Sequence, residues 1–122
     1  MYSALKNRII SEGKILLNKR FENIYLKENF KVSRSTKFIK LDNDRFNLSL
    51  RKTGSDWEVF SQIFMHNEYK PVCRALRLNN INPKLILDLG ANIGLTTAYL
   101  KNIFPDCEVI SVEPDQSNFK QL

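Results

Sequence analysis

The fold of this chain is decided by residues 84–94, which read Lys84-Leu85-Ile86-Leu87-Asp88-Leu89-Gly90-Ala91-Asn92-Ile93-Gly94. The apolar run is short, nearly continuous and bounded by Pro83 and Gly90, a pattern typical of a strand buried on both faces. Four side chains then recur at helical spacing: Ile93, Thr97, Leu100 and Phe104. Pro105 ends the predicted helix.

A second short strand is predicted for Glu108-Val109-Ile110-Ser111-Val112, and Asp115, after Pro114, is well placed to cap a further helix. The order strand, helix, strand is typical of a parallel sheet in an α/β protein.

The residues before this unit predict helices and a β-hairpin. From Ala4 to about Phe30 the apolar residues favour one or two amphipathic helices, which would divide at Gly13. Residues 36–41 and 45–51 alternate polar and apolar side chains around Asp42-Asn43-Asp44, which indicates a hairpin.

Two further helices are predicted between the hairpin and the first parallel strand. Ser55 and Glu58 form a capping-box pattern, so a helix should run from about Asp56 to His66. Pro71 opens a shorter helix over residues 72–78. The expected organisation is a basic region of helices and hairpin, residues 1–52, followed by an α/β region, residues 53–122.

Charge is unevenly distributed between these two regions. Residues 1–52 hold 13 Lys or Arg against 5 Asp or Glu, whereas residues 53–122 hold 6 against 8, within a chain of net charge +6. Such asymmetry can mark an anionic partner, but no aromatic residues alternate with the basic ones as in proteins that stack bases. We therefore expect a solvated basic face and no nucleic-acid partner.

The cysteines and the apolar segments indicate the compartment. Cys73 and Cys107 stand alone, without the paired spacing of a metal site. No apolar segment approaches the roughly 20 residues of a membrane span, and the N-terminus has no signal-peptide pattern. The sequence predicts a reduced, cytoplasmic protein without a transmembrane segment.

A ligand site is predicted where the parallel strands end. In an open parallel sheet, ligands bind beyond the carboxyl ends of the strands. Gly90 and Gly94 would let the backbone turn sharply and approach a ligand, and the amides at the start of the next helix would receive a carboxylate. Glu113, at the end of the second strand, can accept two hydrogen bonds from a ribose. Asp88 adds a negative charge that would stabilise an ammonium or sulfonium group.

Two common nucleotide motifs do not fit this loop. Aligning G-x-G-x-x-G on Gly90 places Asn92 and Leu95 at the second and third glycines, which argues against a dinucleotide. A P-loop would need Gly-Lys-Ser or Gly-Lys-Thr after the first glycine, and neither follows.

The pattern D-x-G-x-x-x-G after a buried strand, with an acidic residue closing the next strand, resembles motifs I and II of class I methyltransferases. Over roughly residues 50–122 the chain resembles the FkbM family in particular. The matching positions are Arg51, Gly54-Ser55-Asp56, Phe60, Gln62-Ile63-Phe64, Glu68-Tyr69, residues 86–94, Phe104-Pro105, Val112-Glu113-Pro114-Asp115 and Asn118-Phe119.

The resemblance implies a Rossmann-like fold, S-adenosyl-L-methionine as cofactor, and methyl transfer to a hydroxyl of a small molecule or glycan. It implies that Gly90, Ala91, Asn92 and Gly94 form the cofactor loop, with Asp88 near the methionine end and Glu113 on the ribose. Tyr69 and Asp56 would help to cover the cofactor. For Asp56 the alternative is helix-terminal stabilisation, and for Tyr69 it is simple packing.

The family's later strands have no counterpart here, and the general base is not identified. We expect an incomplete methyltransferase domain that belongs to a longer enzyme, borrows a partner, or binds the cofactor without turnover. An unpaired apolar strand edge would favour self-association. Two other classes stay open. One is a non-catalytic module whose basic first half binds an anionic partner while the Rossmann-like half is a relic, and the other is a nicotinamide enzyme.

Overall fold

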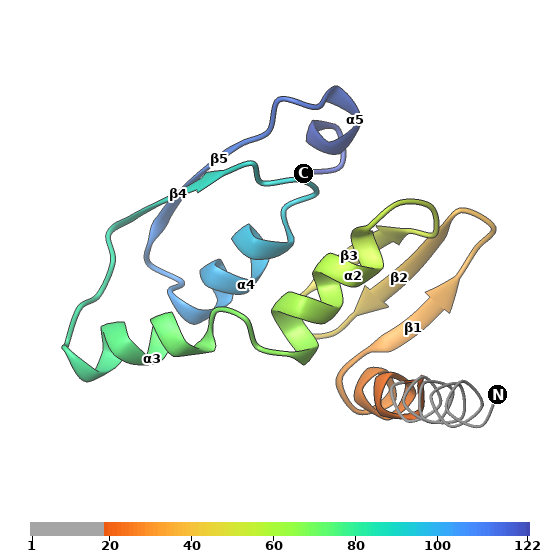
Figure 1. Cartoon of the computed structure of the whole chain (residues 1–122), viewed down its shortest axis with the longest axis horizontal. Coiled ribbons are helices and arrows are strands. Elements are labelled where there is room, and N and C mark those ends of the chain that lie inside the picture. Colours follow the sequence, from red (N-terminus) through yellow and green to blue (C-terminus); the bar gives the residue numbers. More distant parts are fainter. Residues whose placement is uncertain (1–18) are drawn as a thin grey trace, which may run out of the picture.

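The computed structural model describes residues 19–122, which form a mixed α/β structure with two separate sheets (Figure 1). Of the predicted N-terminal helices, the structure shows a helix at residues 19–29, and the part from Ala4 to residue 18 lies outside the described residues. None of the helices within residues 19–122 combines the length and apolar character that a membrane crossing requires.

The first sheet is antiparallel and contains the predicted hairpin. β2 (Phe38–Asp42) pairs with β3 (Asn47–Arg51). The side chain of Asn43 closes the turn, because its Oδ1 accepts hydrogen bonds from the amides of Arg45 and Phe46 at 2.9 and 2.8 Å. A strand that the sequence did not predict, β1 (Lys31–Arg34), adds to β2.

A continuous helical segment follows, close to the predicted bounds but different in detail. It begins as α2 (Asp56–Phe60) and continues as the π-helical turn η1 (Ser61–Met65). The predicted capping box is wrong: Ser55 has φ −105° and ψ 10°, and its side chain makes no capping hydrogen bond. A capping side chain requires an extended backbone at this position, which Ser55 does not have.

The apolar faces of this segment and of the first sheet meet in the main core. Phe60, Leu41 and Leu50 have no exposed surface, and the Phe60 and Phe64 rings stack with centroids 5.0 Å apart. Ile93 and Leu95, on either side of Gly94, are buried in the same cluster. The predicted ligand loop is therefore anchored in the main core at its far end.

The predicted strand-helix-strand unit is confirmed. β4 (Leu85–Leu89) and β5 (Glu108–Val112) are parallel, and α4 (Leu95–Ile103) connects them. The helix α3 (Lys70–Leu78) precedes β4 and begins two residues before its predicted start. The last helix, α5 (Gln116–Phe119), has Asp115 as its N-cap, as predicted.

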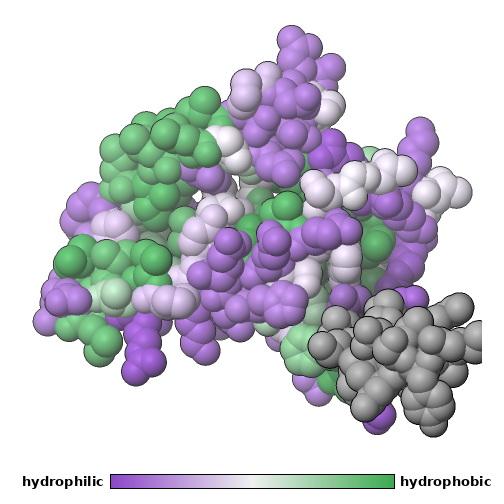
Figure 2. All heavy atoms as spheres, in the orientation of Figure 1, coloured by the Kyte–Doolittle hydropathy of each residue, from purple (hydrophilic) through white to green (hydrophobic). Residues whose placement is uncertain are grey.

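The expectation that β4 is buried on both faces is wrong. Helices α3 and α4 pack on the side of Ile86, where Cys73, Phe104 and Cys107 form a second core. Side chains of the opposite face are half-exposed or more: Leu85, Leu87, Leu89, Ile110 and Val112. Figure 2 shows these strands as an apolar surface. No described element covers this face, and self-association through an unpaired strand edge of this sheet stays a prediction.

Candidate functional site

The loop after β4 has the sharp backbone turns that the glycines predicted. Gly90 and Gly94 have φ values of 80° and 84°, and Asn92 between them has φ 53°. This left-handed region disfavours side chains with a Cβ, although asparagine tolerates it better than most residues. The left-handed conformations of Gly90, Asn92 and Gly94 thus turn the backbone of the loop sharply and keep it close to the ends of β4 and β5.

Hydrogen bonds tie this loop to the carboxyl end of β5. The amides of Gly90 and Ala91 both donate to the carbonyl oxygen of Val112, at 2.8 and 3.0 Å. The amide of Asn92 donates to Oε2 of Glu113 at 2.7 Å. The structure therefore brings together five of the predicted site residues: Gly90, Ala91, Asn92, Gly94 and Glu113.

Glu113 retains capacity for a ligand in this arrangement. Its Oε2 accepts from Asn92, and its Oε1 accepts from the amide of Asp115 at 2.9 Å. Each carboxylate oxygen has two lone pairs, so one on each oxygen is left for a hydroxyl donor. The carboxylate is thus oriented by backbone amides on both sides, as a ribose-binding group needs to be.

The start of α4 offers further polar groups next to the loop. No side chain caps this helix at Gly94, so the amides of its first turn are not satisfied by a capping residue. The Oδ1 atom of Asn92 is buried and has no hydrogen-bond partner among the described residues. A ligand carboxylate would satisfy the amides of the first turn.

The two glycines of the loop differ in the space before them. A Cβ at Gly90 would meet no atom within 4 Å, so a ligand can approach that position freely. A Cβ at Gly94 would lie 2.6 Å from Cδ1 of Leu122. A ligand that reaches Gly94 therefore has to displace the side chain of Leu122.

Asp88 accepts a hydrogen bond from Thr97 of α4, and Thr97 in turn contacts Ser111; the sequence analysis assigned neither hydroxyl residue to the site. Thr97 donates to Oδ2 of Asp88 at 2.6 Å, and the Thr97 and Ser111 hydroxyl oxygens lie 2.7 Å apart. This network joins β4, α4 and β5 below the loop. The alternation of side chains along β5 indicates which face of the sheet Ser111 occupies. The parallel register of β4 and β5 is needed to show that Ser111 lies opposite Asp88.

Tyr69 lies beside the first turn of α4, whereas Asp56 lies behind Arg51, whose guanidinium also binds Asn118 of α5. The Tyr69 hydroxyl oxygen is 3.3 Å from Oγ1 of Thr96, in the first turn of α4. Asp56 is fully buried and forms an ion pair with Arg51 at 2.7 Å. Tyr69 is thus close enough to the loop to contact a ligand there, while the Asp56 carboxylate is occupied by Arg51.

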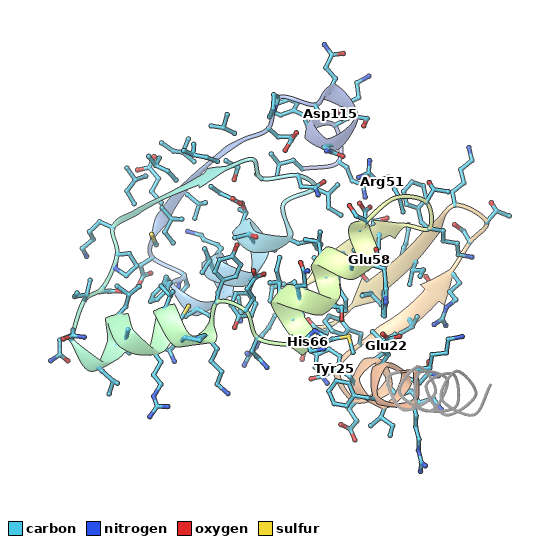
Figure 3. All side chains as sticks on the ribbon, viewed as in Figure 1. Glu22, Tyr25, Arg51, Glu58, His66 and Asp115 are labelled. Carbon is cyan, nitrogen blue, oxygen red and sulfur yellow. The ribbon has the colours of Figure 1, made fainter. Side chains whose placement is uncertain are left out.

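Arg51 connects the first sheet to the segment that follows Glu113. Besides Asp56, its guanidinium donates to Oδ1 of Asn118 in α5 at 2.8 Å. Figure 3 shows Arg51 below Asp115, at the base of α5. The hydrogen bond to Asp56 raises the pKa of Arg51, and the negative charges of Asp56 and Asp115 act in the same direction. Sequence reasoning noted Arg51 and Asn118 only as family-matching positions, without a role.

The cap of α5 should respond to acid. The Ser117 hydroxyl is the main cause of a lowered Asp115 pKa, and the Asn118 amide adds to the effect. A lowered carboxyl pKa stabilises the folded state at pH values above the unfolded pKa, and this stabilisation disappears as the pH falls through the folded pKa. We expect the Ser117 and Asn118 amide shifts, followed by NMR, to change with a midpoint below that of an unperturbed aspartate. An aspartate in a short unstructured peptide serves as the reference, and a midpoint for Asp115 at or above that of the peptide would contradict the prediction.

Comparison of the chain with protein-family models, curated proteins and solved structures finds no match. In residues 19–122 no group of three or more His, Cys, Asp or Glu side chains is placed to hold a metal ion. The chemistry of the site therefore has to be argued from its own residues.

Proposed function

We propose that residues 84–118 form the first half of an S-adenosylmethionine site, of the kind found in class I methyltransferases that resemble the FkbM family. The observation that carries the proposal is the Glu113 carboxylate, which is fixed by the amide of Asn92 and directed at the glycine loop. In the same loop, a Cβ at Gly90 would meet no atom within 4 Å, so a ligand can approach the loop there.

The residues present fit the cofactor better than a dinucleotide. S-adenosylmethionine has a ribose for Glu113 and a carboxylate for the first turn of α4. A dinucleotide would need a third glycine for close helix–strand packing, and that position is Leu95, which is buried in the core.

When bound, the cofactor supplies an electrophilic methyl group on a sulfonium. The chain's own part is to bind and orient: Glu113 holds the ribose, the loop from Gly90 to Gly94 shapes the pocket, and Tyr69 borders the first turn of α4. Much of the rate enhancement in methyl transfer comes from aligning the acceptor oxygen with the methyl group. The contacts that position the cofactor are therefore the main contribution of these residues to the mechanism. The proposed acceptor is a hydroxyl of a small molecule or a glycan.

Calorimetric titration tests the proposal. S-adenosylmethionine and S-adenosylhomocysteine should bind saturably with a stoichiometry of one, and NAD should give no heat of binding at the same concentrations. Binding of NAD in preference to both would point to a nicotinamide enzyme. A folded chain that binds neither S-adenosylmethionine nor S-adenosylhomocysteine would contradict a site complete enough to work alone.

A further inference from the structure

Three basic side chains lie along one face of α3. Lys70, Arg74 and Arg77 are spaced four and three residues apart, which places them on the same side of the helix. At a rise of 1.5 Å per residue the row spans about 10 Å. None of the three belongs to the proposed methyltransferase site.

This row borders a cavity between α3 and α4. The cavity has a volume of about 460 Å³, and its lining is three cations plus Asn67, Cys73, Leu78, Tyr99 and Ile103. A second hollow of about 490 Å³ lies on the other side of the row and shares Lys70 and Arg74, with His66 at its edge. Among these described lining residues there is no carboxylate, so nothing in either wall offsets the positive charge.

The other titratable groups of the cavity are neutral near pH 7. Burial raises the pKa of the Cys73 thiol and of the Tyr99 hydroxyl, while the charge of Arg77 acts against this in both. The cavity between the helices thus combines a purely cationic rim with a neutral wall of Tyr99, Leu78 and Ile103.

This combination fits a small molecule with an anionic and an apolar part. The volume lies within the range of about 300–1,000 Å³ for small-molecule sites. Arginine presents a planar fork of donors that matches phosphoryl oxygens, and two arginines with a lysine suit one or two phosphoryl groups. A flat polyanion would contact the basic side chains on α3 but would make no contact with the neutral wall of Tyr99, Leu78 and Ile103.

We propose that the α3–α4 cavity binds an organic phosphate, with its phosphoryl groups on Lys70, Arg74 and Arg77 and its uncharged ring against Tyr99 and Ile103. This site is separate from the loop of Gly90 and Glu113, and it does not depend on the proposed methyl transfer.

Titration of the whole chain with uridine diphosphate, pyrophosphate and uridine tests the proposal. Uridine diphosphate should bind saturably and more tightly than pyrophosphate, and uridine should not bind detectably. Each charge-assisted contact contributes about tenfold, so the double variant Arg74→Gln/Arg77→Gln should weaken binding by about a hundredfold. Amide shifts of the wild-type chain should map to α3 and α4, which tests the site even where a variant folds poorly.

Two control variants separate this site from other surfaces. Arg34→Gln/Lys37→Gln removes the same charge from the first sheet and should leave binding unchanged, as should Glu108→Ala at the exposed start of β5. Equal loss in the sheet variant would overturn the proposal in favour of non-specific attraction. Tight binding of a single-stranded oligonucleotide to α3, without saturable binding of uridine diphosphate, would overturn it in favour of a polyanion surface.

Discussion

Replacing Glu113 by alanine should lower the affinity for S-adenosylmethionine by about a hundredfold or more. The variant loses two charge-assisted hydrogen bonds to the ribose, each contributing about a factor of ten. It also removes the acceptors of the Asn92 and Asp115 amides, so the loop and the start of α5 lose their shared anchor. Calorimetry on the folded variant measures the effect.

Two matched variants make this prediction specific. Glu113→Gln keeps one acceptor oxygen and should lose only about tenfold. Glu108→Ala removes a carboxylate from the opposite end of the same strand, where the side chain is exposed, and should change nothing. Unchanged affinity in a folded Glu113→Ala variant would remove the main support for a ribose at this position.

The second large effect concerns stability. Arg51→Met should lower the free energy of unfolding by about 3 kcal/mol, because it leaves the carboxylate of Asp56 buried without its partner. Asp56 has no exposed surface, so water cannot replace the guanidinium without opening the turn between β3 and α2. Urea denaturation, followed by circular dichroism, measures the change.

The double variant Arg51→Met/Asp56→Leu distinguishes a broken ion pair from lost packing. Removing both charges should recover part of the stability that Arg51→Met loses, since the buried charge has gone. Arg45→Met, at an exposed arginine of the hairpin turn, should stay within about 0.5 kcal/mol of the wild type. A double variant less stable than Arg51→Met would show that the side chains act by packing instead.

Much of the fold was predictable because it follows local patterns. The apolar run of β4, the helical spacing of α4 and the turn residues around Asn43 each specify their element within a short window. Asp115 was predictable as a cap for the same reason. β1 was not predicted, because Val32 is the only aliphatic residue among its four. These residues form a strand because they pair with β2.

Other features depend on contacts distant in sequence. The Ser55 and Glu58 pattern predicted a capping box, but the turn before α2 instead serves the ion pair of Asp56 with Arg51. Burial of β4 was predicted from its composition, whereas actual burial depends on which elements cover the sheet, and α3 and α4 cover one face. The spacing of apolar residues in this segment does not distinguish the π-helical turn η1 from an α-helical turn.

The candidate site was predictable to a similar extent. The glycine loop and Glu113 were identified from their position after successive strands, and the structure brings them together. The hydrogen bonds of Thr97 with Asp88 and with Ser111 emerge only when β4, α4 and β5 are packed. Their role is to fix Asp88, a task that spacing alone does not reveal.

The most direct test of the central proposal is a titration of the ¹⁵N-labelled chain with S-adenosylhomocysteine, followed by amide chemical shifts. A cofactor site at the ends of β4 and β5 predicts the largest saturable shifts at Gly90, Ala91, Asn92 and Gly94, together with Glu113. Shifts confined to α3 and α4, or no saturable shifts in a folded chain, would contradict it.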